Sequence, residues 1–89
     1  MKVRKILDDP SVVILLHIQE KDSARHSDLV KLNHSRSTLS LVLRDLEDEG
    51  LIERKVVTTR PFRVDYTLTS LGTRVASGFR GIKKELSEN

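Results

Sequence analysis

Residues 35–50 read SRSTLSLVLRDLEDEG and predict one amphipathic α-helix with a clear beginning and end. Ser35 is a favourable N-cap, and Gly50 can take the left-handed conformation that commonly follows a helix. At 100° per residue the other apolar positions fall within about 60° of Leu39. This core face holds Leu39, Val42, Leu43 and Leu46. The outward face holds Ser37, Ser40, Leu41, Arg44, Asp45 and Asp48.

An apolar segment nearer the N-terminus predicts another helix. Asp9 is a favourable N-cap and Pro10 suits the first helical position, so we expect a helix from there to about Lys21. Its apolar side chains point in nearly all directions around the axis, so the helix must be buried on most sides. They are Val12, Val13, Leu15, Leu16 and Ile18.

Between these two helices the sequence predicts a loop, a short helix and a turn. We expect a loop over residues 21–25, after which Ser27 and Asp28 resemble an N-cap followed by a first-turn acid. The short helix would run through Leu32, and Asn33 would end it because asparagine tolerates the conformation of tight turns. Two helices joined by a turn, the second with a polar outer face, indicate a helix-turn-helix.

After Gly50 the pattern is typical of strands. Residues 62–68 alternate in polarity, which predicts a strand with one apolar face. That face holds Phe62, Val64, Tyr66 and Leu68. Residues 51–57 are strand-like in composition, and residues 58–61, Thr-Thr-Arg-Pro, would form the tip of a hairpin between the two strands.

A last helix is predicted from Thr69 or Ser70, either of which can cap it. Its apolar residues recur every three or four positions and form a narrow stripe, a pattern that suits helix pairing. The stripe holds Leu71, Val75, Phe79, Ile82 and Leu86. We expect dimerisation through this helix.

Length and composition favour a dimer of one small domain. A chain of 89 residues without cysteine can use neither disulfides nor thiolate metal sites to supplement a small core, so oligomerisation is the expected source of added stability. The three histidines lack a metal-ligand spacing, and no cofactor is expected. The longest apolar run, residues 12–16, is far short of a membrane span, and no signal-peptide core is present, so we expect a cytoplasmic protein.

The charge is distributed unevenly. The chain carries +3 overall, but residues 1–49 hold eight basic and nine acidic side chains, whereas residues 50–89 hold eight and four. A polyanion would therefore be met mainly by the second half. Carboxylate clusters such as Asp8-Asp9 are better explained as caps or solvated faces than as catalytic pairs, and no nucleophile and base are combined, so we expect no enzyme.

Three phrases together resemble the winged helix regulators of the MarR and HxlR type. They are Ser35-Arg36-Ser37-Thr38-Leu39-Ser40, residues 46–54 (LEDEGLIER) and residues 63–72 (RVDYTLTSLG), and the similarity covers about residues 12–80. The resemblance implies an α+β fold, mainly α with a small β-hairpin: a three-helix core, a two-stranded wing and a C-terminal dimerisation helix. It implies one DNA-binding domain over residues 1–89, with the core and wing in 10–69 and the dimerisation helix in 70–87.

The resemblance also implies sequence-specific binding to double-stranded DNA as a homodimer that regulates transcription. The helix after the turn would enter the major groove, and the wing would approach the minor groove or the backbone. The residues expected at DNA are Ser35, Arg36, Ser37, Thr38, Ser40, Leu41, Arg44, Arg54, Lys55, Arg60 and Arg63. Those expected in the dimer interface are Val75, Phe79, Ile82 and Leu86.

The sequence departs from this family pattern at three places. The turn before the recognition helix is short, with Asn33 and His34 where a glycine and an aliphatic residue are common. Leu41 and Asp45 occupy outward positions that are often basic. The cysteine that HxlR-type sensors often carry near the N-terminus is absent, which argues against thiol sensing.

Alternatives remain open for several of these residues. Arg44 could pair with Asp48 one helical turn away, and one of Ser37, Thr38 and Ser40 could be a first-turn cap. One basic residue of the wing could pair with Glu53 or Asp65. For the whole chain the alternative is a winged helix protein-interaction module, which would show an apolar or acidic patch where a DNA regulator shows a positive stripe. A small-molecule effector bound between protomers is also left open.

Overall fold

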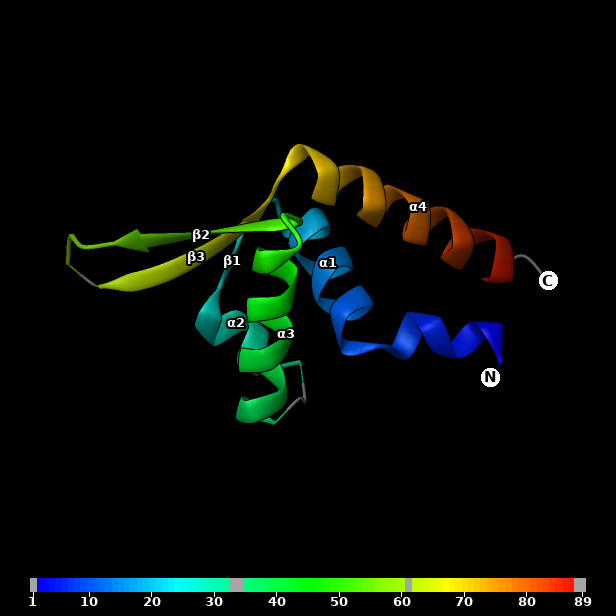
Figure 1. Cartoon of the computed structure of the whole chain (residues 1–89), viewed down its shortest axis with the longest axis horizontal. Coiled ribbons are helices and arrows are strands. Elements are labelled where there is room, and N and C mark those ends of the chain that lie inside the picture. The colour runs from blue at the N-terminus through cyan, green and yellow to red at the C-terminus, as the bar shows by residue number, and fades with distance from the viewer. Residues whose placement is uncertain (1, 33–34, 61, 88–89) are drawn as a thin grey trace.

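The computed structural model describes residues 2–32, 35–60 and 62–87 as a mainly helical chain with a small sheet (Figure 1). The elements are, in chain order, a 3₁₀ helix η1 (Val3–Asp8), α1 (Pro10–Lys21), β1 (Ala24–Arg25), α2 (His26–Val30), α3 (Arg36–Asp48), β2 (Ile52–Val57), β3 (Arg63–Leu68) and α4 (Ser70–Ser87). The expected fold class is confirmed. The predicted turn at Asn33 and the Pro61 position of the hairpin tip lie outside the described residues.

The ends of α1 and α3 form as the sequence predicts. The Asp9 carboxylate accepts a hydrogen bond from the Ser11 backbone N–H at 2.9 Å, which caps α1. The Ser35 hydroxyl accepts from the Thr38 N–H at 3.1 Å, which caps α3. Gly50 has a φ of +74°, the left-handed conformation expected after α3.

The sheet has three strands, one more than the predicted hairpin. Its order is β1-β3-β2 and all pairs are antiparallel, with Ala24 opposite Tyr66 and Ile52 opposite Leu68. The expectation of a continuous loop over residues 21–25 is therefore wrong at its last two residues. Pairing with β3 supplies backbone partners for Ala24, whose side chain is buried.

The start of α2 also differs from the prediction. The helix begins at His26, one residue before the expected Ser27 cap. Asp28 accepts a hydrogen bond from the Arg25 N–H at 3.2 Å, so a side chain inside the first turn reaches back to the residue that precedes the helix.

One apolar core joins α1, α2, α3, the sheet and α4. Ile14 and Ile18 of α1 lie at its centre, and Leu29 and Leu39 from the helix-turn-helix pack in the same cluster. Burial of α1 on most sides is confirmed, because Val12, Leu15 and Leu16 are buried as well. The core thus holds α3 by its apolar face and leaves the opposite face free.

Polar contacts tie α4 to α1. Arg80 donates from Nε to the Gln19 side-chain oxygen at 2.8 Å and from its guanidinium to the Leu16 carbonyl at 3.2 Å. Gln19 in turn donates to the Ser77 hydroxyl at 2.9 Å. The two helices therefore lie together, while the hairpin extends away on the other side of the molecule (Figure 1).

Two apolar surfaces are less covered than their patterns suggest. Phe62, placed by alternation on the apolar face of the strand, is 69% exposed because it precedes β3 and no described element covers it. On the α4 stripe Leu71 and Ile82 are 43% and 39% exposed. No helix in residues 2–32, 35–60 and 62–87 has the length and hydropathy needed to cross a membrane.

Candidate nucleic-acid interface

The outer face of α3 projects into solvent. Arg36, Ser40 and Arg44 are exposed, and Leu41 keeps 60% of its surface accessible despite being apolar. Arg44 forms no hydrogen bond or ion pair with any described residue, so the alternative pairing with Asp48 is not formed. Figure 1 shows α3 running from the base of β2 to the edge of the molecule, and it contacts α1, α2 and β2.

The hydroxyl groups at the start of α3 mainly organise the helix. Ser35 donates to the Thr38 hydroxyl at 2.8 Å as well as accepting its N–H, and the Ser35 and Ser37 oxygens lie 3.3 Å apart. Thr38 is half-buried. Ser35 serves as the predicted N-cap, and among the described residues no backbone N–H donates to the side chain of Ser37, Thr38 or Ser40, so the alternative that one of these three is a cap is not met. Ser37 and Ser40 are the exposed hydroxyls on this end of α3.

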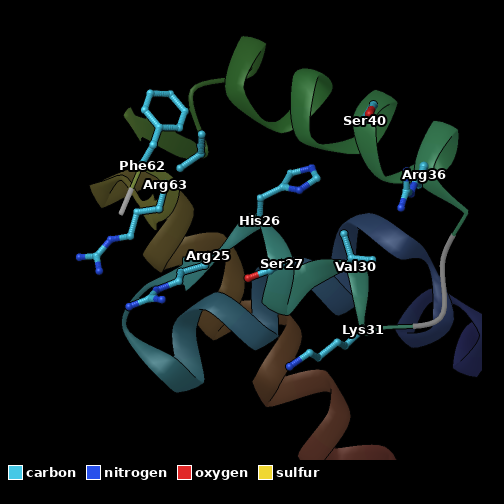
Figure 2. Close-up of a pocket in the computed structure, with 10 residues that line it drawn as sticks. Arg25, His26, Ser27, Val30, Lys31, Arg36, Ser40, Phe62 and Arg63 are labelled. Atoms are coloured by element: carbon cyan, nitrogen blue, oxygen red, sulfur yellow. The ribbon is translucent and has the colours of Figure 1, made fainter. Parts of the chain in front are cut away.

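An open groove of about 830 Å³ connects the start of α3 with the wing (Figure 2). Its lining comes from β1, α2, α3 and the beginning of β3. The lining residues are Arg25, His26, Ser27, Val30, Lys31, Arg36, Ser40, Phe62, Arg63 and Val64. Four of them are lysine or arginine, and no carboxylate is among the described lining residues.

Sequence reasoning missed the contribution of β1 and α2 to this groove. The sequence predicts a loop at Arg25 and a short helix at Lys31, and neither residue is among those expected at DNA. In the structure both line the groove from the two ends of α2, whereas Arg36 lies at the start of α3 (Figure 2). His26 is exposed, with its ring centre 6.4 Å from that of Tyr66. Arg25 is positioned by its pairing with Asp65 on β3. No local sequence pattern predicts that pairing.

The predicted wing residues divide between the two faces of the hairpin. Lys55 and Arg63 share a face with Asp65, because Lys55 lies opposite Asp65 and Arg63 is two residues from it. Arg63 donates from Nε to the Asp65 carboxylate at 3.2 Å, so the expected ion pair forms, along β3 rather than across the hairpin. Arg54 lies on the other face, and Arg60 is exposed near the tip.

The predicted dimer residues line one side of α4. Val75, Phe79 and Leu86 are half-buried and Ile82 is exposed. Only part of the stripe is therefore used in packing within the chain. Gly78, on the same helix, has nothing within 4 Å of the position that a Cβ would take.

Comparison with known proteins assigns the family. The model of the HxlR-like helix-turn-helix family matches residues 7–89. The chain belongs to this family. A search of curated proteins gave no match. Among solved structures, this HxlR-like chain is similar to a putative transcriptional regulator, ytfH from Salmonella typhimurium, with a TM-score of 0.79 and 27% identity over 97% of this chain and 81% of that one.

Two further structures have the same architecture as this HxlR-like chain. A transcriptional regulator homologue from Pyrococcus horikoshii gives a TM-score of 0.77 at 25% identity, covering 93% of this chain and 85% of that one. MepR of Staphylococcus aureus, in complex with DNA, gives 0.75 at 27% identity, covering 89% and 66%. The predicted kinship with winged helix transcription regulators is confirmed, and such regulators are not enzymes.

Proposed function

We propose that this HxlR-like regulator binds double-stranded DNA as a homodimer and controls transcription. The observation that carries the proposal is the basic groove between α2, the start of α3 and the wing, which has four cationic side chains and no carboxylate among its described lining residues. DNA presents a dense row of phosphates to any such surface. MepR, a neighbour in fold, is itself seen in a DNA complex.

In this proposal α3 enters the major groove. Arg44 lies unpaired on the outward face of the helix and can reach a guanine edge or a phosphate. Leu41, exposed one residue after Ser40, can contact the methyl group of a thymine. Ser37 and Ser40 supply hydroxyl donors to phosphates, with Arg36 adding charge near the start of the helix.

The wing would contact the minor groove or the backbone through Arg60. Arg60 is exposed near the hairpin tip, and its side chain forms no hydrogen bond or ion pair within the described part of the chain. Arg54 and Lys55 lie on opposite faces of β2 and would neutralise phosphates on either side of the tip. Arg63 would contribute less because its charge is partly satisfied by Asp65.

The homodimer would form through α4. Val75, Phe79, Ile82 and Leu86 present an incompletely covered apolar stripe, and a second α4 would remove it from water. Two recognition helices about 34 Å apart would then meet successive major grooves of a pseudo-palindromic site. In this assembly residues 10–69 provide DNA contact and residues 70–87 provide the interface.

The alternative role, a protein-interaction module, requires an apolar or acidic surface between α3 and the wing. The groove there is basic, which favours DNA. Leu41 and Asp45 are the residues on α3 that fit the alternative, and they lie on a face shared with Arg44.

A fluorescence anisotropy titration with genomic fragments tests the proposal. We expect affinity to fall steeply with salt, and Arg44→Ala to weaken binding about 5- to 100-fold if the contact is to a base. Arg74→Ala is the matched control, because Arg74 is an exposed arginine of α4 that lines neither the basic groove nor the outer face of α3. Equal loss in the two variants, or no binding at low salt, would refute the proposal.

A further inference from the structure

The basic groove between α2, the start of α3 and the wing has an apolar lining in addition to its cationic side chains. Its apolar residues are Val30 at the end of α2, Phe62 beside the hairpin tip and Val64 of β3 (Figure 2). Phe62 is 69% exposed and Val30 is 37% exposed. Both side chains therefore face water in the groove, and covering them would be favourable.

The course of β3 explains how this apolar surface arises. Tyr66 and Val64 lie on the same face of the strand, because alternate residues of a strand share a face. Tyr66 is buried in the core, whereas Val64 is half-buried and lines the groove. Phe62, two residues nearer the tip, lines the same groove. The apolar face that packs in the core thus continues along the wing beyond the edge of the core.

Cationic side chains accompany this apolar lining. They are Arg25, Lys31, Arg36 and Arg63, and the described lining residues include no carboxylate. Within residues 2–32, 35–60 and 62–87, the side chains of Lys31 and Arg36 form no hydrogen bond or ion pair. An occupant that suits the whole lining must therefore carry several negative charges and expose apolar surface between them.

One strand of a DNA duplex has this alternation, because deoxyribose separates its successive phosphates. In the proposed function α3 enters the major groove and the wing approaches the minor groove or the backbone. The strand that separates those two grooves of the duplex would then cross the space between α3 and the wing. Its phosphates would meet Lys31 and Arg36, and the sugar between them would meet Phe62.

We propose that Phe62 packs on a deoxyribose of this strand and makes the groove selective for deoxyribose over ribose. The inference rests on the proposed function, because the strand enters the groove only when α3 and the wing bind the duplex. Ribose carries its 2′-hydroxyl at the minor-groove side, which the wing approaches. Pressed against the phenyl ring, that hydroxyl would lose its water and gain no partner of equal strength.

Anisotropy titrations with singly substituted duplexes test this inference. A bound genomic fragment is trimmed to the shortest duplex that keeps its affinity, and one deoxyribonucleotide at a time is replaced by the ribonucleotide. At one position of each half-site we expect binding to weaken about fivefold or more, because a hydroxyl is buried without a partner. This loss should disappear in Phe62→Ala. Phe62→Leu should retain most of it, since leucine still covers the sugar with an apolar group.

Two controls separate a direct contact from a change in DNA shape. A 2′-fluoro nucleotide favours the same sugar pucker as a ribonucleotide but has no hydroxyl to desolvate, so at the sensitive position it should bind nearly as well as DNA. Val3→Ala is the matched protein control, because Val3 is 66% exposed in η1 and does not line the groove. Its ribose loss should equal that of the parent protein. Thermal melting of both variants should be unchanged, since both side chains are exposed.

Several outcomes would overturn the inference and leave the proposed function standing. They are equal losses for the ribonucleotide and the 2′-fluoro nucleotide, a ribose loss that persists in Phe62→Ala, and DNA binding with no ribose-sensitive position. Sedimentation of Phe62→Ala tests the other occupant: dissociation of a dimer would assign the apolar lining to a second copy and overturn the inference as well. Failure of the parent chain to bind DNA at low salt would instead refute the proposed function, and the inference with it.

Discussion

Gly72 is the residue on which the junction between α3, β2 and α4 depends. The Thr69 hydroxyl accepts from the Gly72 N–H at 3.0 Å and donates to the Gly50 carbonyl at 2.6 Å. The Thr69 N–H donates to the Leu51 carbonyl at 3.1 Å. These bonds draw the first turn of α4 onto the backbone at Leu51, and a Cβ at position 72 would overlap the Leu51 carbonyl oxygen.

We therefore expect Gly72→Ala to destabilise the protein by about 1–3 kcal/mol, because backbone must move to admit one methyl group. Gly78→Ala, in the same helix, should stabilise it by about 0.5–1 kcal/mol, because nothing lies within 4 Å of the added carbon and alanine favours the helix. Urea denaturation measures both. Similar values for the two variants would contradict the assigned role of Gly72.

Ser35 was predicted both to cap α3 and to contact DNA. Ser35 was expected at DNA, and its hydroxyl is committed to Thr38 and lies beside that of Ser37. Ser35→Ala should lower the free energy of unfolding by about 1 kcal/mol through loss of the cap. Thermal melting checks this, with Ser40→Ala as the control, since Ser40 is exposed in the same helix and has no described hydrogen bond.

Among the elements, the hairpin is held at its base and free at its tip. At its base β3 has two neighbouring strands, because Ala24 and Arg25 of β1 pair with it on one side and β2 pairs with it on the other. Beyond that point the two strands of the wing pair only with each other. The tip, near Arg60 and Phe62, can therefore adapt to a nucleic-acid surface while the base stays in register with the core.

Arg60→Ala should weaken DNA binding about three- to tenfold and lower the salt slope by about one, because a single phosphate or minor-groove contact is lost. Lys84→Ala removes the same charge from the exposed end of α4 and should leave both quantities unchanged. Anisotropy titrations at three salt concentrations give the affinity and the slope together. A larger effect for Lys84→Ala would place the DNA elsewhere.

The elements that sequence predicts well are those whose signals are local. Asp9, Ser35 and Gly50 mark helix ends through their own hydrogen bonds or conformation, and the apolar face of α3 follows from spacing alone. β1 is different: two residues have no period, and their strand conformation comes from pairing with residues 65–66, some forty positions later. The basic groove was missed in part for the same reason, since Arg25 lies in that long-range pairing, and α2, whose C-cap is Lys31, follows β1 directly.

At the scale of the whole molecule, the incompletely covered stripe on α4 predicts self-association. Ile82→Lys should convert a dimer to a monomer, because a charge would be placed within an apolar interface. Val56→Lys makes the same exchange at an exposed valine of the wing and should remain dimeric. Sedimentation velocity at micromolar concentration distinguishes the two. A parent chain that is monomeric under these conditions would remove the dimer from the proposed function.

The bonds from Arg80 and Gln19 that fasten α4 to α1 bear on which operators could be recognised. If α4 pairs with α4 of a second copy, each protomer moves as one rigid body. The distance between the two recognition helices is then nearly fixed. One base pair added between half-sites moves them about 3.4 Å apart and rotates them by roughly 35°. A dimer with this rigid geometry should bind operators with one spacing between half-sites and bind much more weakly when the spacing is one base pair longer or shorter.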